Sequence, residues 1–369
     1  MSLSKPAPIL SHMPWNIKRD IVNSANNRTK FSLRGCSKEF KSLVDSSRFQ
    51  FESLILHNNP KEDSISVELI LDDDDNDDHI NTRKIKFSAH PDGFSKQICH
   101  EDGNFEKKVV TGSQNYIDAA VARFSKVIGN PKVSFDELRV ASALFIARPF
   151  TGDTVKYLSQ KSEVLDKIQE FLGSLNYKVS TREFRINLFH CQEDVLKVFP
   201  YLEPGTLKVL KCEYPPLYEA DLINGSYRVT VDFSAICELQ QWKQANELRL
   251  KVNSNLPFEK WAHFSNCTIK LKRFTLENVK QLIEAYSRNP NLRFNDCFVE
   301  QFRTRNRTEI RNFLSQFTVV RPKKKFNVPI ANSTDHIRVE VSSSVSFQRR
   351  SETDDDSDSS DDSDSSDEE

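Results

Sequence analysis

The sequence predicts an α+β protein in which three short N-terminal helices precede a longer region of alternating strands and helices. Two observations carry this prediction. Between Leu10 and Val44, apolar residues recur with helical spacing, each time after a residue that favours a helix start. From Val179 onward, strand-like and helix-like segments alternate, which indicates crossover connections and a mainly parallel sheet. The 369 residues could form two domains and bury a sizeable core.

The first helix is predicted from Pro14, because proline fits a first helical turn, where its missing N–H would be unbonded anyway. Ile17 and Ile21 follow one turn apart on a single face. Asn26 and Asn27 end this helix.

The second and third helices are predicted around Phe31 and after Ser37, a residue that can cap a helix start. The third helix has an apolar stripe made of Phe40, Leu43 and Val44. Three helices of this length bury little surface. We therefore expect a partner or the following domain to cover part of their apolar face.

The next segment is predicted to hold strands and then helices. Alternating apolar residues predict strands at Phe49–His57, Ile65–Leu71 and Arg83–Phe87. Amphipathic spacing predicts helices at Tyr116–Ile128 and at Leu158–Leu172, each followed by a glycine. The Asp-rich run 72–78 is read as a solvated acidic loop, with metal binding as the alternative, because it lacks the Gly and Glu of an EF-hand.

Beyond Val179 the chain alternates between the two kinds of element. The predicted strands are 184–188, 207–212, 247–252, 267–271 and 292–299, and the predicted helical stretches are 193–201, 235–246 and 276–288. Each strand and helix needs a neighbour to bury its apolar face, so a leucine-rich-repeat-like array is the expected architecture.

The C-terminal tail, Ser351–Glu369, contains 11 acidic residues and no basic ones. A segment of this composition cannot bury apolar surface, and we expect it to be disordered. Five hydroxyl residues have an acid three positions later, the pattern of acidophilic kinase sites; these phosphorylation candidates are Ser351, Thr353, Ser359, Ser365 and Ser366.

Charge is distributed unevenly, although the whole chain carries a net charge of only −1. Of the 53 acidic residues, 11 lie in the tail, which leaves 42 against 52 Lys and Arg in residues 1–350. The segment Gln301–Arg350 holds 11 basic and three acidic residues. It includes a nuclear-import candidate, Arg321, Pro322, Lys323, Lys324 and Lys325, for which a solvated basic strand end is the alternative. A basic body permits nucleic-acid contact as well.

No motif for catalysis or for a cofactor is present. Gly-rich phosphate loops, GxSxG and HExxH are absent from the sequence, and the seven cysteines are spread singly without CxxC pairs. His90, Cys99 and His100 do not have the spacing of a standard metal site, and His190 with Cys191 is read as strand packing. We expect no enzyme activity, cofactor, metal or disulfide. Because no apolar run is long enough to span a bilayer, we expect a soluble intracellular protein, cytoplasmic or nuclear, without membrane contact.

The N-terminal segment resembles an F-box. Met13-Pro14 stands where the family has Leu-Pro, the run 29–34 matches the basic-apolar-polar-Leu-Arg segment, and residues 36–45 match the closing Val-Cys-Lys, aromatic and Leu-Val-Asp. Trp15-Asn16 replaces the usual acidic pair. The resemblance implies binding to a Skp-type adaptor, and through it to a cullin, by Leu10, Met13, Pro14, Ile17, Ile21, Phe31, Leu33 and Cys36.

Downstream, roughly Val179–Val299, the chain resembles the FTH domain that follows the F-box in a large nematode family of the F-box A type. The string Gln241-Trp242-Lys243-x-Ala245 is the most specific part of this similarity. Trp242 and Ala245 are interpreted as core residues, with a role in recognition as the alternative.

These resemblances imply a flexible segment 1–9, an F-box at 10–48, connecting elements at 49–175, an FTH domain at 176–305, a basic segment at 306–350 and the acidic tail. The order of the modules implies a non-catalytic substrate receptor of a Skp-cullin-F-box ubiquitin ligase, whose FTH region holds a target protein. The alternative is a nucleic-acid or chromatin-associated binding protein with a masking acidic tail, although no nucleic-acid-binding motif is evident.

Overall fold

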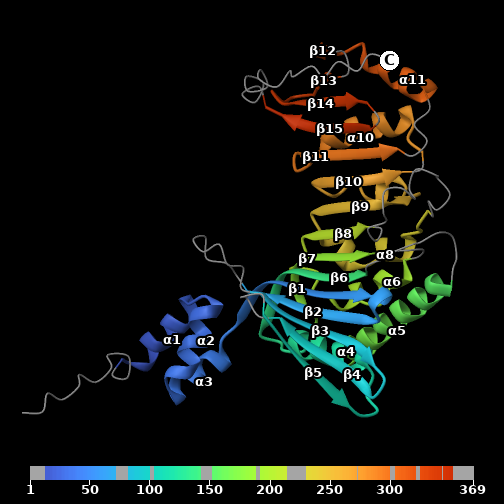
Figure 1. Cartoon of the computed structure of the whole chain (residues 1–369). Coiled ribbons are helices and arrows are strands. Elements are labelled where there is room, and N and C mark those ends of the chain that lie inside the picture. Colours follow the sequence, from blue (N-terminus) through green and yellow to red (C-terminus); the bar gives the residue numbers. More distant parts are fainter. Residues whose placement is uncertain are drawn as a thin grey trace, which may run out of the picture. The chain divides into compact units, whose positions relative to one another are not determined.

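The computed structural model describes residues 13–71, 82–99, 104–142, 152–187, 192–213, 230–271, 273–299, 304–320, 325–342 and 344–351. These residues form two compact units. The first contains the described residues of Met1–Asn187 and Glu193–Leu207, and the second contains those of Lys208–Tyr214 and Ser226–Glu369. Figure 1 labels the elements of both units.

Three short helices open the first unit: α1 (Trp15–Ser24), α2 (Asn27–Cys36) and α3 (Lys38–Ser46). Pro14 precedes α1 as its cap. The Asn26 side chain accepts a hydrogen bond from the Thr29 N–H, and Ser37 accepts one from the Phe40 N–H. The chain is therefore helical in the three stretches that the sequence predicts, because Asn26 and Ser37 each satisfy the start of the next helix, although Pro14 precedes the first turn of α1 rather than lying in it.

The three helices share one small core. Its buried members are Val22 on α1, Leu33 on α2, and Phe40, Leu43 and Val44 on α3. The predicted apolar stripe of α3 is thus confirmed.

The sheet of the first unit has seven strands in the order β7-β6-β1-β2-β3-β4-β5. Their bounds are β1 (Phe49–Asn59), β2 (Ser64–Ile70), β3 (Thr82–His90), β4 (Gly93–Cys99), β5 (Phe105–Thr111), β6 (Val133–Ser142) and β7 (Ser180–Asn187). β1, β6 and β7 are parallel, whereas β1 to β5 form antiparallel pairs in chain order. The predicted β1, β2 and β3 are confirmed, whereas β4, β5 and β6 were not predicted.

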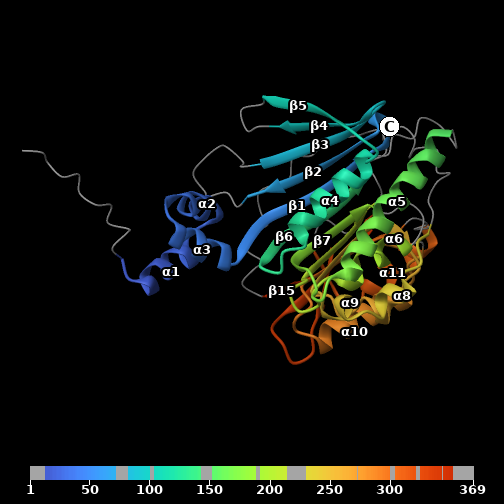
Figure 2. The same cartoon turned by 90° about the horizontal axis from the view of Figure 1, so that it is seen from below.

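Helices α4 (Tyr116–Ile128) and α5 (Gly152–Ser174) lie on one face of this sheet (Figure 2). The bounds predicted for α4 are confirmed, and Asn115 caps its start. α5 is longer than predicted: it begins before Leu158 and includes Gly173, so the glycine does not end the helix. The short helices α6 (Glu193–Leu196) and η3 (Phe199–Tyr201) occupy the stretch predicted as a single helix.

Four parallel strands form the centre of the second unit: β8 (Val209–Glu213), β9 (Glu247–Ser254), β10 (Asn266–Leu271) and β11 (Phe294–Val299). The predicted parallel order is confirmed. Between them run α8 (Ser234–Cys237), α9 (Gln240–Gln244), η4 (Phe258–Lys260) and α10 (Leu276–Arg288), and α11 (Thr304–Leu314) follows β11. The stretch 235–246 forms two helices rather than one, because Leu239 is extended, with ψ 146°.

Side chains at matching positions of these strands form buried rows. Leu250 pairs in register with Cys212 on one side and with Ile269 on the other, and Ile269 pairs with Cys297. All four are fully buried, and Cys267 and Cys237 are also buried. These thiols fill space as small apolar groups, and burial raises the pKa of Cys237 to about 12, which keeps it protonated.

The C-terminal segment forms β12 (Thr318–Val320), β13 (Lys325–Pro329), β14 (His336–Val341) and β15 (Ser344–Arg350), each antiparallel to the next. β15 also pairs antiparallel with β11. The described residues of the basic segment Gln301–Arg350 therefore form α11 and four strands. Arg349 contributes to this structure, because its guanidinium pairs with Asp335 at 3.1 Å and donates to the Tyr286 carbonyl.

Trp242 lies in the core of the second unit, as predicted, with 1 % of its surface exposed. Its ring centroid is 5.1 Å from that of Phe264 in an edge-to-face contact and 6.3 Å from that of Phe233. The indole N–H donates to the Lys260 carbonyl at 2.7 Å. Ala245 is buried as well.

Within the described residues, no helix has both the length and the apolar character that crossing a bilayer requires.

We predict that Trp242→Ala lowers the free energy of unfolding by about 3–5 kcal/mol, because it leaves a cavity beside Phe233 and Phe264 and removes the hydrogen bond to Lys260. Urea denaturation followed by circular dichroism measures this change. An unchanged midpoint, together with a loss of binding to a target, would instead make Trp242 a recognition residue.

Candidate functional site

Two surfaces of the described residues have the composition of binding sites. The first is the exposed apolar part of α1 and α2. Trp15, Ile17 and Phe31 are large apolar side chains with 52 %, 43 % and 38 % of their surface exposed. Other exposed large apolar side chains of the described residues lie on strands, namely Phe105, Val109 and Phe294. Three such side chains on a helical unit of this small size are typical of an interaction surface.

The predicted adaptor-binding residues differ in exposure. Pro14, Ile17, Phe31 and Cys36 are exposed, whereas Met13 and Ile21 are half-buried. Leu33 is 8 % exposed and belongs to the core of the three helices, so the structure places it beneath the surface rather than on it. Leu10 lies outside the described residues. Trp15, which the sequence indicated only as a departure from the F-box pattern, is the most exposed tryptophan of the described residues.

Phe31 also connects the helices to the sheet of the first unit. Its ring stacks on Phe49 with centroids 5.6 Å apart, Phe49 stacks on Phe51 at 6.2 Å, and Phe51 stacks on Phe135 at 6.1 Å. The Lys30 ammonium lies over the Phe49 ring, 5.6 Å from its centroid, and donates to the Arg48 carbonyl at 2.8 Å. Burial lowers the pKa of Lys30. One face of Phe31 is thus occupied by the protein.

On α3, Asp45 forms an ion pair with Arg34 of α2 at 2.6 Å. The hydrogen bond from Arg34 holds the pKa of the Asp45 carboxyl below its usual range. Both groups are exposed, so the pair orients α2 against α3 while contributing little to stability.

The remaining predicted sites are mostly outside the described part of the chain. This applies to Thr353, Ser359, Ser365 and Ser366, to Arg321, Pro322, Lys323 and Lys324, and to the Asp-rich run 72–78, His100, His190 and Cys191. Lys325 is the first residue of β13, and Ser351 directly follows β15. Among the described residues, no three His, Cys, Asp or Glu side chains are grouped so that they could hold a metal ion.

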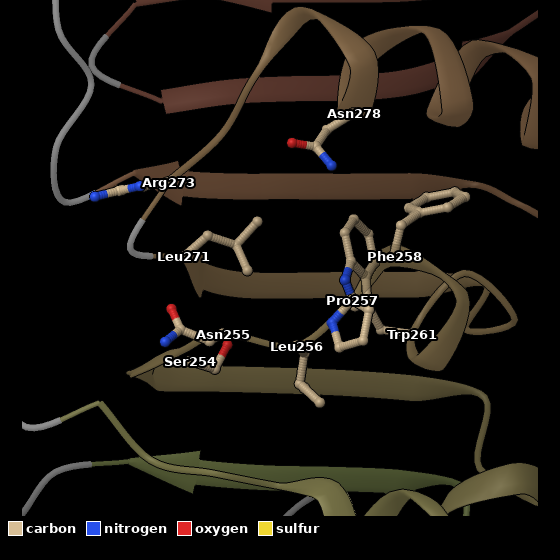
Figure 3. Close-up of a pocket in the computed structure, with 9 residues that line it drawn as sticks. All are labelled: Ser254, Asn255, Leu256, Pro257, Phe258, Trp261, Leu271, Arg273 and Asn278. Atoms are coloured by element: carbon tan, nitrogen blue, oxygen red, sulfur yellow. The ribbon is translucent and has the colours of Figure 1, made fainter.

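The second surface is a pocket of about 300 Å³ at the carboxyl ends of β9 and β10 (Figure 3). Ser254 is the last residue of β9 and Leu271 is the last residue of β10. Because these strands are parallel, their ends open at the same edge of the sheet, where ligands commonly bind in α/β proteins. The pocket is lined by Ser254, Asn255, Leu256, Pro257, Phe258, Trp261, Leu271, Arg273 and Asn278.

Trp261 is the most informative residue of this pocket. It is 1 % exposed, and Phe258 packs against it edge to face with centroids 5.1 Å apart. Figure 3 shows the indole between Phe258 and Leu271, with its nitrogen on the side of Leu271. The indole N–H has no hydrogen-bond partner among the described residues. An unsatisfied buried donor costs about 1–3 kcal/mol.

The other polar groups of the pocket are mostly donors as well. The Oδ1 atom of Asn278 accepts two hydrogen bonds from Thr275, one from the backbone N–H at 3.0 Å and one from the side-chain hydroxyl at 2.9 Å. Both belong to the capping box of α10. The Asn278 amide nitrogen is left to donate. Arg273 is exposed and is the one charged residue among the nine that line the pocket. The apolar walls come from Leu256, Pro257, Phe258 and Leu271.

Sequence reasoning did not select any residue of this pocket. One signal was present: Ser254, Asn255 and Arg273 lie shortly after the predicted ends, Val252 and Leu271, of two strands that were predicted to belong to a mainly parallel sheet. The burial of Trp261 with an unpaired N–H could not be read from the sequence, because it depends on contacts between distant segments.

Residues 162–317 match the model of the FTH domain family. The match begins within α5 and ends after α11, beyond both predicted boundaries, and it contains the pocket and both Trp242 and Trp261. The N-terminal helices lie outside it. No curated protein matches the chain, and no solved structure matches it.

The two buried tryptophans of the second unit provide a test of the pocket. We predict that Trp242→Phe costs more stability than Trp261→Phe, because Trp242→Phe abolishes a hydrogen bond and leaves the Lys260 carbonyl unpaired, a loss of about 1–3 kcal/mol. Trp261→Phe removes a donor that has no partner among the described residues, so the main cost to stability is the smaller volume of the phenylalanine ring. Urea denaturation of both variants measures the difference, and a larger cost at Trp261 would show that its N–H is satisfied in the protein.

Proposed function

We propose that the protein is a substrate receptor of a Skp-cullin-F-box ubiquitin ligase, in which α1–α3 bind a Skp-type adaptor and the FTH segment binds a target protein. The observation that carries the proposal is the exposure of Trp15, Ile17 and Phe31 on a three-helix unit that precedes an FTH match. The FTH domain is a family associated with F-box proteins. The resemblance of residues 10–48 to an F-box supports the same order of modules.

Packing explains why the three helices suit this role. Their shared core has five buried apolar side chains, and Trp15 and Ile17 do not reach it. A partner that covers these two side chains would gain about 25 cal/mol for each Å² of apolar surface removed from water. Aromatic and aliphatic anchors of this kind supply most of the binding energy of protein interfaces.

The chain would contribute placement rather than chemistry. In such a ligase, another subunit brings the loaded conjugating enzyme close to the bound target, and the receptor raises the effective concentration of the target lysine. This role needs no catalytic residue in the chain. It also places the protein inside the cell.

The competing class is a nucleic-acid or chromatin-associated protein. Some basic side chains near the C-terminus already have internal partners, since Arg349 pairs with Asp335 and Arg311 donates to the Val341 carbonyl at 2.9 Å. Binding to DNA or RNA whose affinity falls steeply with salt would favour that class over the ligase role.

We predict that the double variant Pro14→Glu with Ile17→Glu loses binding to a Skp-type adaptor, with an increase in Kd of about a hundredfold or more, because each substitution places an unpaired carboxylate in an apolar contact. Both positions are exposed, and carboxylates are favourable near a helix N-terminus, so α1 should still form. Size-exclusion chromatography with purified adaptor, followed by calorimetry, measures the effect.

Asn23→Glu is the matched control, because Asn23 is exposed on the same helix, lies about two turns beyond Trp15 and Ile17, and points away from both. It should co-elute with the adaptor as the wild type does. If the folded wild-type chain fails to co-elute, the ligase role is wrong. If the double variant binds as tightly as the wild type, the proposed interface is wrong.

A further inference from the structure

The pocket at the carboxyl ends of β9 and β10 has the chemistry of an anion site with an apolar wall. Among its nine lining residues, Arg273 is cationic and none is acidic. The pocket lies beside the first turn of α10, whose N-terminus is capped by Thr275 and Asn278 and carries Glu277, so the positive charge that favours an anion comes from Arg273. Trp261 and Asn278 add neutral donors. An acceptor-rich, negatively charged group matches this set.

The unpaired N–H of Trp261 is independent support for a ligand. Trp242, equally buried in the same unit, has its N–H bonded to a carbonyl. Buried tryptophans normally have such a partner. Trp261 is the exception, and it lines a pocket whose other residues include the guanidinium of Arg273 and the amide of Asn278 (Figure 3). A ligand oxygen would satisfy it.

The size of the pocket limits the ligand. A volume of about 300 Å³ is at the low end of the range for small-molecule sites and is too small for a long peptide. It has to accept both an anionic group and the apolar group that Leu256, Pro257, Phe258 and Leu271 would contact. In an extended peptide, neighbouring side chains point to opposite sides, so an acid and its apolar neighbour would not both enter. A C-terminal residue carries a carboxylate and a side chain on one Cα.

We propose that this pocket binds the C-terminal residue of a target chain, with the carboxylate held by Arg273 and the Asn278 amide, an oxygen of the terminal residue or its preceding peptide accepting from Trp261, and an apolar side chain against Leu271 and Phe258. This inference deepens the proposed function, on which it rests, by naming the class of target: a protein with an exposed C-terminus that ends in an apolar residue. Arg273 suits this role, because a guanidinium binds carboxylates through two parallel hydrogen bonds.

The test uses the full chain and three acetylated tripeptides as probes: Gly-Gly-Leu with a free carboxylate, the same peptide with a C-terminal amide, and Gly-Asp-Leu with a C-terminal amide. A ligand-observed NMR titration measures each Kd. We expect the free acid to bind with a Kd of about 1 mM or tighter, and both amides to bind at least about tenfold more weakly.

Two variants locate the site, and one controls for charge. Arg273→Gln, at an exposed position, should weaken binding of the free acid about tenfold or more, and Trp261→Phe should weaken it by a smaller factor. Arg288→Gln removes an exposed arginine at the far end of α10, where its partner is Glu284, and should leave binding unchanged.

Equal affinity for the acid and the amide of Gly-Gly-Leu, or no binding by the wild type at 10 mM peptide, would overturn the proposal, as would unchanged binding by Arg273→Gln. Equal binding of the amidated Gly-Asp-Leu would overturn the assignment to a C-terminus. Co-elution with the Skp-type adaptor is measured on the same variants. Peptide binding without adaptor binding would reject the ligase role but not the peptide site. Adaptor binding without peptide binding would reject the peptide site but not the ligase role.

Discussion

The parallel pairing of β8, β9, β10 and β11 is the constraint on which the second unit depends. Parallel neighbours cannot be joined by a tight turn, so the chain has to cross back over the sheet between them. The crossovers carry the helices and the apolar side chains that bury the sheet face, among them Trp242 and Phe264. Because every strand runs in the same direction, the loops after β9 and β10 open at one edge. The pocket is a consequence of this geometry rather than an addition to it.

The antiparallel strands at the C-terminus extend the sheet of the second unit beyond β11. β15 pairs with β11, and the Tyr286 hydroxyl of α10 donates to the Phe347 carbonyl of β15 at 2.9 Å and accepts from the Asn295 amide of β11 at 3.1 Å. These bonds connect a helix to two strands at a fully buried position. The C-terminal end of α10 is thereby held against the sheet, which helps to position its N-terminus beside the pocket.

The three N-terminal helices leave large apolar side chains exposed. They have too few residues to bury all their apolar side chains, and Trp15 and Ile17 remain exposed. The row of rings from Phe31 through Phe49 and Phe51 to Phe135 connects them to the sheet of the first unit. A helical unit that is anchored on one side and apolar on another is suited to holding a partner. The same exposure would be a liability in a protein that had no partner for it.

Local signals predicted much of the fold. The caps at Asn26 and Ser37 and the periodicity of α4 and α10 were readable because they depend on neighbouring residues. The strands β13, β14 and β15 were not predicted, although Ile337, Val339 and Val341 alternate as a strand requires. Leu33 is buried because α2 packs against Val22 of α1 and Phe40 of α3, and the pocket around Trp261 forms where the loops after β9 and β10 meet α10. Both depend on how neighbouring elements pack against one another, which one sequence does not reveal.

In the proposed role, the chain uses α1 and α2 to join an adaptor while its parallel sheet remains free to hold a target. Hydrogen–deuterium exchange of the full chain, with and without a purified Skp-type adaptor, tests this claim most directly. We expect the adaptor to slow amide exchange in Trp15–Ser24 and Asn27–Cys36 and to leave exchange in β8–β11 and around Trp261 unchanged. Unchanged exchange in both helices, or slowing confined to the second unit, would contradict it.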